Sequence, residues 1–220
     1  VDASWHMPAT GRNPRAEYEA EHIPGAVFFD IDEIADTDNP LPHMVPSPEK
    51  FSSRMRKLGL GDGNRIVIYD TLGIVSAARA WWLLRLFGHQ DVAILDGGLP
   101  KWKTEGRPVS DAPVKPAERH FTARINSFLL REKDQIARNI GMAREQVVDA
   151  RSAGRFTADE PEPREGLRGG HIPGSLNLPF TELFNRDDGT LQDAEALRTI
   201  FDRSGIDFKK PVITSCGSGV

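Results

Sequence analysis

The sequence predicts an α/β fold made of two similar domains in tandem, each a mostly parallel sheet flanked by helices. Three short motifs occur twice, in the same order and 146 to 149 residues apart. VDA opens the chain and recurs at Val148, HIPG begins at His22 and at His171, and RIVIYD at Arg65 is echoed by PVITSC at Pro211. Two copies of this length indicate a duplicated domain, because solenoid proteins stack three or more much shorter repeats.

The first copy alternates short apolar runs with helical patterns, which is typical of a parallel sheet covered by helices. Residues 65–70 and 91–96 are the predicted strands. A helix is predicted over 47–59, where Ser47 can cap the amino end and a glycine follows the last turn. A second helix is predicted over 73–88, where apolar residues recur at helical spacing.

The second copy has the same character, with a predicted strand ending at Ser215 and a predicted helix over 193–205. We expect a first domain over 1–107, a linker and inter-domain segment over 108–140, and a second domain over 141–220. The proline-rich stretch that opens this middle segment is typical of a linker. The second domain is expected to be C-terminally incomplete, because the first copy continues well beyond the corresponding position.

Composition narrows the classes of function. The 220 residues carry a net charge of −4, with 39% hydrophobic and 27% charged residues. This balance lacks the basic surface of a nucleic-acid-binding protein, and no apolar run reaches the roughly 18 residues of a membrane span. The single cysteine, Cys216, excludes an internal disulfide and argues against a thiolate metal site. We expect a cytoplasmic protein, a monomer or weak dimer, with no partner among nucleic acids or membranes.

The cysteine stands in a loop that suits a reactive thiol. Cys216 follows a predicted strand, and Gly217 and Gly219 allow successive backbone N–H groups to face one point, where they would stabilise a thiolate. A buried structural cysteine at a strand end is the ordinary alternative. The corresponding residue in the first copy is Asp70, so that copy has no nucleophile and Asp70 is expected to be structural.

Four motifs together, CGSGV, HIPG in both copies, DGGLPKW and AGRFTADEPEPREG, resemble the two-domain rhodanese-type sulfurtransferase family, and most closely its mercaptopyruvate branch. The resemblance covers essentially the whole chain and implies two tandem rhodanese-like domains, the second of them catalytic. It implies that Cys216 takes sulfur from 3-mercaptopyruvate, releases pyruvate and holds the sulfur as a persulfide. A thiol such as thioredoxin, or cyanide, would then accept the sulfur, and no metal or organic cofactor would be needed.

The resemblance also implies a substrate site. Arg155 and Arg164 would bind the carboxylate and keto group of the substrate, and Gly217, Gly219 and Val220 would line the loop around it. A guanidinium group suits this task because it offers two parallel donors to a carboxylate. The alternative is that both arginines only pair with the acidic residues of their own loop.

A Ser–His–Asp relay has been proposed in this family, and the matching positions here are Ser218, His43 and Asp32. Such a relay would move a proton to or from the substrate, with the acid orienting the imidazole ring. The alternatives are that His43 is an exposed loop histidine and that Asp32 is a helix N-cap.

Three other functions stay open. A thiosulfate sulfurtransferase usually carries basic residues after the cysteine, whereas Gly217 and Ser218 are neutral. A phosphatase or arsenate reductase on the same fold needs an arginine six positions after the cysteine, which lies outside this sequence. A non-catalytic rhodanese-like binding module is the third, and the presence of Cys216 argues against it.

Overall fold

The computed structural model describes residues 1–164 and 166–220. The chain divides into two compact units. The first contains Val1–Leu129 together with Arg186–Thr190 and Ser218–Val220, and the second contains Leu130–Asn185 and Leu191–Gly217. The domain boundaries predicted from the sequence stay predictions, and each unit is described by itself.

The first unit alternates helices with two parallel strands, as the sequence predicts. In chain order its elements are η1 (Pro8–Thr10), α1 (Pro14–Ala20), α2 (Ile31–Ile34), α3 (Pro48–Lys57), β1 (Ile66–Ile68), α4 (Ala77–Leu86), β2 (Val92–Ile94), α5 (Gly98–Thr104) and η2 (Ser127–Leu129). The Ser47 side chain accepts the N–H of Lys50 and caps α3, as expected. The helix predicted over 73–88 begins later, at Ala77, because the residues before it form a loop around Asp70.

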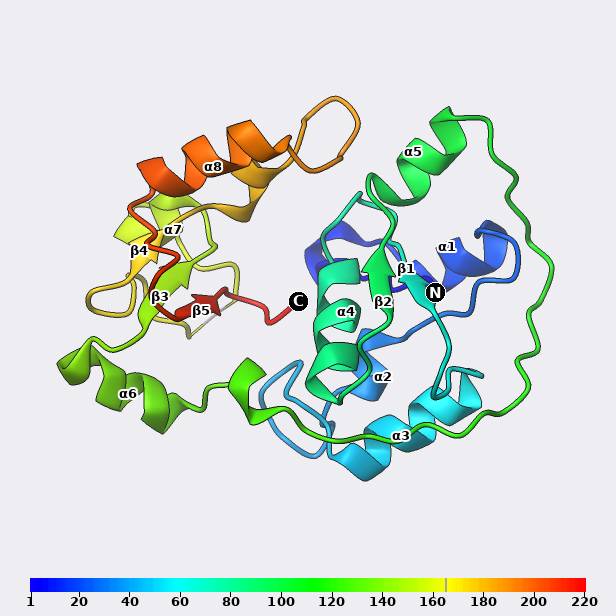
Figure 1. Ribbon diagram of the computed structural model, residues 1–220. Coiled ribbons are helices and arrows are strands. Elements are labelled where there is room, and N and C mark those ends of the chain that lie inside the picture. The colour runs from blue at the N-terminus through cyan, green and yellow to red at the C-terminus, as the bar shows by residue number, and fades with distance from the viewer. Residues whose placement is uncertain (165) are drawn as a thin grey trace. The chain divides into compact units, whose positions relative to one another are not determined.

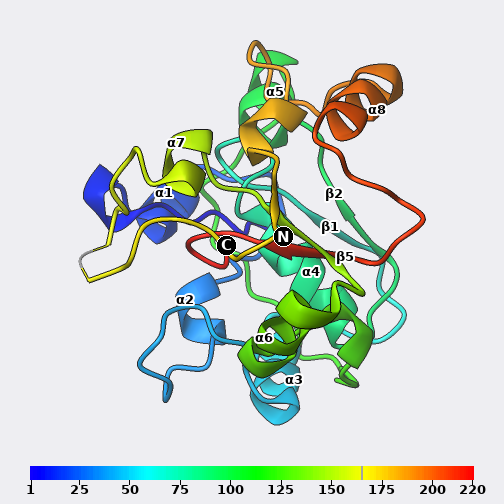
Figure 2. The same cartoon turned by 90° about the vertical axis from the view of Figure 1, so that its left-hand side faces the viewer.

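The sheet of the first unit is parallel. Strand β1 pairs with β2 in the register Ile66↔Val92, and Asp2 forms parallel bridges with both Phe28 and Tyr69. Figures 1 and 2 show β1 and β2 side by side, with α4 packed against them. The apolar face of α4 is buried on these strands, which stabilises the layer by removing hydrocarbon surface from water.

Aromatic side chains fill much of the core of the first unit. The rings of Phe51 and Phe87 stack with their centroids 4.3 Å apart, and Phe121 meets Phe51 edge-on at 5.6 Å. All three are buried. Phe121 comes from the extended segment after α5, which Figure 1 shows running along the outside of the unit. The part of the expected linker around Phe121 is therefore anchored to the first unit by core packing.

The second unit is built from a three-stranded parallel sheet and four helical segments among its described residues. In chain order its elements are α6 (Lys133–Met142), β3 (Gln146–Asp149), α7 (Ala153–Thr157), β4 (Leu176–Asn177), η3 (Phe180–Leu183), α8 (Ala194–Arg203) and β5 (Val212–Ser215). The strand order is β4–β3–β5. Val148 of β3 packs with Ile200 of α8 and with Leu178 and Ile206 in a small apolar core.

The pairing registers of the two units repeat the sequence duplication. Asp149 at the end of β3 pairs with Asn177 on one side and Ser215 on the other. Asp2 bridges Phe28 and Tyr69, which are the corresponding positions of the first copy. The predicted class, α/β with two similar units that each contain parallel strands flanked by helices, is therefore confirmed. No helix among the described residues is long and apolar enough to cross a membrane.

Candidate active site

The loop after β1 in the first unit is folded around a carboxylate. Asp70 is fully buried, and its two oxygens accept the backbone N–H groups of Leu72, Val75 and Ala77 at 2.8, 2.7 and 2.8 Å. Ala77 is the first residue of α4, so the positive end of the helix also faces the carboxylate. This loop is therefore a backbone cradle for one negative charge, which agrees with the structural role expected for Asp70.

Replacing Asp70 by asparagine is expected to lower the free energy of unfolding by about 2 kcal/mol. The amide NH₂ would face backbone N–H donors that now bond a carboxylate oxygen, and these buried donors would lose their partner. Urea unfolding measures the loss, with Asp91→Asn as the control, because Asp91 is exposed and only loosely paired with Arg65 at 3.5 Å. Equal stabilities of the two variants would contradict the cradle.

In the second unit, Cys216 occupies the position that corresponds to Asp70. It directly follows β5, at the carboxyl edge of the parallel sheet, and its side chain is exposed and not in a disulfide. Ligands of open α/β sheets bind at this edge. Gly219 has φ +73°, as its counterpart Gly73 has φ +113°, so both loops need glycine at this point.

Arg155 lies against the loop that follows β5 and contains Cys216 and Gly217, which we call the thiol loop. It sits on α7, whose amino end is capped by the Ser152 side chain. A side chain added at Gly217 would collide with the guanidinium group of Arg155, so the arginine touches the residue that directly follows Cys216. The Arg155 Nη2 atom also donates to Glu162 at 2.6 Å. The pairing that the sequence left as an alternative is therefore present, together with the approach to the loop.

Arg164 is half-buried in a bend after α7 and makes no hydrogen bond or ion pair with another described residue. It lies in the same unit as Cys216 and Arg155. Its guanidinium group is therefore uncommitted within the part of the chain that the structure describes.

The first unit brings together Asp32, His43 and the main chain of Ser218. The imidazole Nε2 of His43 lies 2.9 Å from Asp32 Oδ1, and Nδ1 lies 2.5 Å from the carbonyl oxygen of Ser218. The Ser218 hydroxyl instead accepts the N–H of Val220 at 3.3 Å. Each ring nitrogen of His43 therefore lies within hydrogen-bond distance of an oxygen atom.

The structure does not agree with the alternative roles considered for His43 and Asp32. The His43 side chain is 3% exposed rather than an exposed loop histidine. Asp30, not Asp32, caps α2 by accepting the N–H of Glu33. The hydrogen bond from His43 holds the pKa of Asp32 below its ordinary value, and a bond from the Trp5 indole adds to this despite partial burial. Asp32 is therefore an ionised partner of the imidazole at neutral pH.

Two residues that sequence reasoning missed hold His43 in place. The Trp5 indole N–H donates to both carboxylate oxygens of Asp32, and the Trp5 ring meets the imidazole edge-on at 5.0 Å. The Arg79 guanidinium donates to the carbonyl oxygen of His43. His43 has φ +57°, a left-handed conformation that is uncommon for a residue with a side chain. No local sequence signal predicts these contacts, because the partners come from distant segments.

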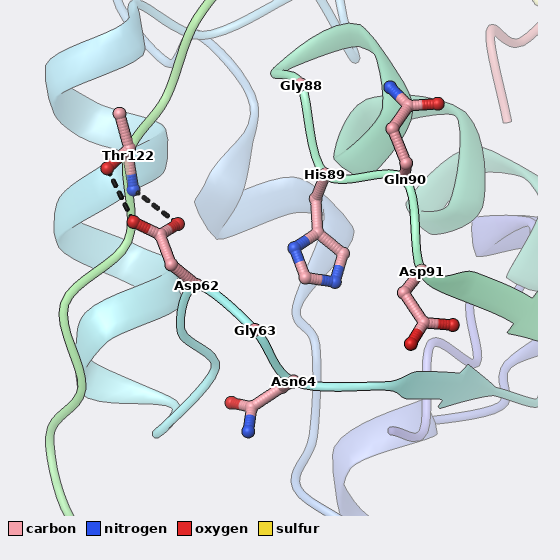
Figure 3. A pocket seen from close by; sticks show the side chains of 8 residues that line it. All are labelled: Asp62, Gly63, Asn64, Gly88, His89, Gln90, Asp91 and Thr122. Atoms are coloured by element: carbon pink, nitrogen blue, oxygen red, sulfur yellow. Dashed lines mark hydrogen bonds between the residues drawn. The ribbon is translucent and has the colours of Figure 1, made fainter.

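Two cavities of the first unit differ in their relation to these residues. Asp32 and His43 line a pocket of about 230 Å³ whose other wall is the loop 35–42. A pocket of about 290 Å³ lies at the amino ends of β1 and β2 (Figure 3) and contains no predicted site residue. Figure 3 shows Asp62 of this second pocket bonded to Thr122. This second pocket is the weaker candidate for a substrate site, because it lies at the end of the sheet opposite the carboxyl edge.

No group of three potential ligands suited to a metal ion occurs among the described residues.

Comparison with known proteins relates this chain to rhodanese-like domains and to sulfurtransferases. The family model for the rhodanese-like domain matches residues 11–105 and 132–220. The whole chain aligns with human 3-mercaptopyruvate sulfurtransferase at 43% identity, covering 74% of that protein. It also aligns over its whole length with rat thiosulfate sulfurtransferase at 42% identity, again covering 74% of the relative.

A solved crystal structure also has the same fold as this chain. The crystal structure of SseA from Escherichia coli, described as a 3-mercaptopyruvate sulfotransferase, superposes with a TM-score of 0.90 at 41% identity, over all of this chain and 82% of that one. Overall identity does not separate the mercaptopyruvate from the thiosulfate enzymes, because both lie near 43%. With two rhodanese-like domain matches and relatives of this identity along its whole length, the chain belongs to the family of tandem-domain rhodanese sulfurtransferases.

Proposed function

We propose that this protein transfers sulfur from 3-mercaptopyruvate, through a persulfide on Cys216, to a thiol acceptor such as thioredoxin or to cyanide. The observation that carries the proposal is the contact of the Arg155 guanidinium with Gly217, next to the thiol. A guanidinium beside the nucleophile is a suitable anchor for a substrate that carries both a carboxylate and a sulfur atom.

The chemistry needs only groups of the protein and the substrate. The thiolate of Cys216 attacks the sulfur of 3-mercaptopyruvate, so an S–S bond forms and the C–S bond breaks. The bonding electrons leave as the enolate of pyruvate, and one proton converts this enolate to pyruvate. The thiolate of the acceptor then attacks the outer sulfur of the persulfide and releases Cys216.

The Asp70 loop supports the way in which the negative sulfur would be held. In the first unit, backbone N–H groups converge on the carboxylate that follows β1. The duplicated loop after β5 places Cys216 at the corresponding position, and Ser218 at the position of the first donor, Leu72. The same convergence would stabilise a thiolate or a persulfide anion, which lowers the energy of the reactive form.

Thiosulfate is the competing substrate, and the two can be told apart by charge. Thiosulfate is a dianion and would be favoured by basic residues after the cysteine, whereas Gly217 and Ser218 are neutral. We expect kcat/KM to be higher for 3-mercaptopyruvate than for thiosulfate, measured as pyruvate and sulfite release by the full-length protein. A higher kcat/KM for thiosulfate would assign the protein to the other branch.

Replacing Arg155 or Arg164 by alanine is expected to raise KM for 3-mercaptopyruvate. Each lost charge-assisted hydrogen bond costs on the order of 1.5–3 kcal/mol, which corresponds to roughly 10- to 150-fold in kcat/KM. Arg203→Ala is the matched control, because Arg203 is an exposed arginine of the same unit, paired with Glu182. An unchanged KM for both site variants would remove the arginines from the substrate site.

A further inference from the structure

A partly buried chain of alternating charges leads from the sheet to the thiol loop. Asp149 ends β3. Its carboxylate accepts hydrogen bonds from two guanidinium nitrogens of Arg151, Nε and Nη2. Arg151 Nη1 donates to one oxygen of Glu162 at 2.6 Å, and Arg155 Nη2 donates to the other oxygen, also at 2.6 Å. Glu162 is therefore the bridge that joins Arg155 to the rest of the protein.

Glu162 is an ionised and confined bridge. Its side chain is 4% exposed, against 22% for Arg155. The hydrogen bond from Arg155 holds the pKa of Glu162 below its ordinary value, although burial acts in the opposite direction. A buried carboxylate needs partners for its charge, so Glu162 restricts the positions that the Arg155 side chain can occupy.

The nitrogen of Arg155 that bonds Glu162, Nη2, is also the atom of the guanidinium that lies nearest to the thiol loop. Gly217 lies so close to the guanidinium that a side chain at this position would force Arg155 to move. The Nε atom of Arg155 is buried and has no hydrogen-bond partner among the residues that the structure describes. Glu162 thus holds the guanidinium through Nη2, at the place where the guanidinium meets the residue that follows Cys216.

We propose that Glu162 is a positioning residue: it orients Arg155 beside the thiol loop before the substrate arrives, so that the remaining donors are ready for the substrate carboxylate. This inference rests on the proposed function. Without the Glu162 charge, the guanidinium groups of Arg151 and Arg155 would lose their shared counter-charge and repel each other. Arg155 would then have to be ordered by the substrate, which weakens binding more than it slows the chemical step.

The test is Glu162→Gln in the full-length protein, assayed with 3-mercaptopyruvate. Glutamine keeps the size of the side chain but has no charge, and its NH₂ group would face one of the two arginine donors that now bond a carboxylate oxygen. We expect KM to rise by about 10-fold or more, with kcat within about 3-fold of the wild type. Glu162→Asp keeps the charge and should recover part of the loss. Glu182→Gln, which removes an exposed glutamate–arginine pair of the same unit, should leave KM unchanged.

A double-mutant cycle separates positioning from general stability. If Glu162 acts through Arg155, adding Glu162→Gln to Arg155→Ala should change KM by less than about 2-fold. A full 10-fold effect in both backgrounds, or an unchanged KM in the single variant, would overturn the proposal. Absence of turnover by the wild type would instead refute the proposed function, so the two failures are distinguishable.

Discussion

Replacing Cys216 by serine is expected to abolish pyruvate release from 3-mercaptopyruvate, a fall of about 1,000-fold or more. A serine hydroxyl is almost entirely protonated at neutral pH, and oxygen is a poor nucleophile toward sulfur, whereas a thiolate is a good one. The wild type treated with substrate in the absence of acceptor should gain about 32 Da, the mass of one sulfur atom, and the variant should gain nothing. Intact-mass spectrometry and a pyruvate assay measure the two effects.

A matched control for this experiment is Thr214→Ser, an exposed position of β5 two residues before the thiol. It should keep both the activity and the mass increase, because it alters the same strand without touching the nucleophile. Retained pyruvate release by the serine variant would mean that another group performs the transfer.

Replacing His43 by alanine is expected to lower kcat by about 100-fold or more, which is the usual scale of general acid–base assistance. The imidazole is buried and bonded to the ionised Asp32, whose carboxylate also accepts the Trp5 indole N–H, so the ring is held in one orientation. The enolate formed when the C–S bond breaks needs a proton, and the prediction is that His43 supplies it. The measurement is kcat against pH for both proteins.

The control for His43 is His120→Ala, which removes an exposed histidine of the same unit. Asp32→Asn should cost less than His43→Ala, because the imidazole remains and only its counter-charge is lost. Since the pKa of Asp32 lies below its ordinary value, its contribution to stability is present at neutral pH and is lost only as the pH falls through that lowered pKa. An unchanged kcat and pH profile in His43→Ala would leave the histidine with a structural role alone.

The geometry of the relay differs in one respect from the expectation. His43 meets the carbonyl oxygen of Ser218, while the hydroxyl is engaged by the N–H of Val220. A carbonyl oxygen can accept a hydrogen bond but cannot pass a proton on, so the predicted proton transfer rests on the pair Asp32–His43. Participation of the Ser218 hydroxyl stays a prediction.

The sequence by itself determined the duplication, the α/β class and the identity of the nucleophile candidate. These features can be predicted because they depend on neighbours along the chain, such as the apolar runs of the strands and the Ser47 cap of α3. The spacing of the repeated motifs shows that Cys216 corresponds to Asp70 in the duplication. In the structure, Asp149 pairs with Ser215 and Asp2 with Tyr69, which are positions that the duplication relates to each other.

Only the tertiary structure decided which side chains form hydrogen bonds with the candidate site residues. Glu162 bonds Arg155 from seven positions away and Arg151 from eleven, and Trp5 bonds Asp32 from a distant segment. Such contacts arise where loops converge at the edge of a sheet, and loops carry no periodic pattern that would reveal their path. The candidate nucleophile can therefore be predicted from the sequence, whereas the charges and hydrogen bonds around its neighbours follow from the fold.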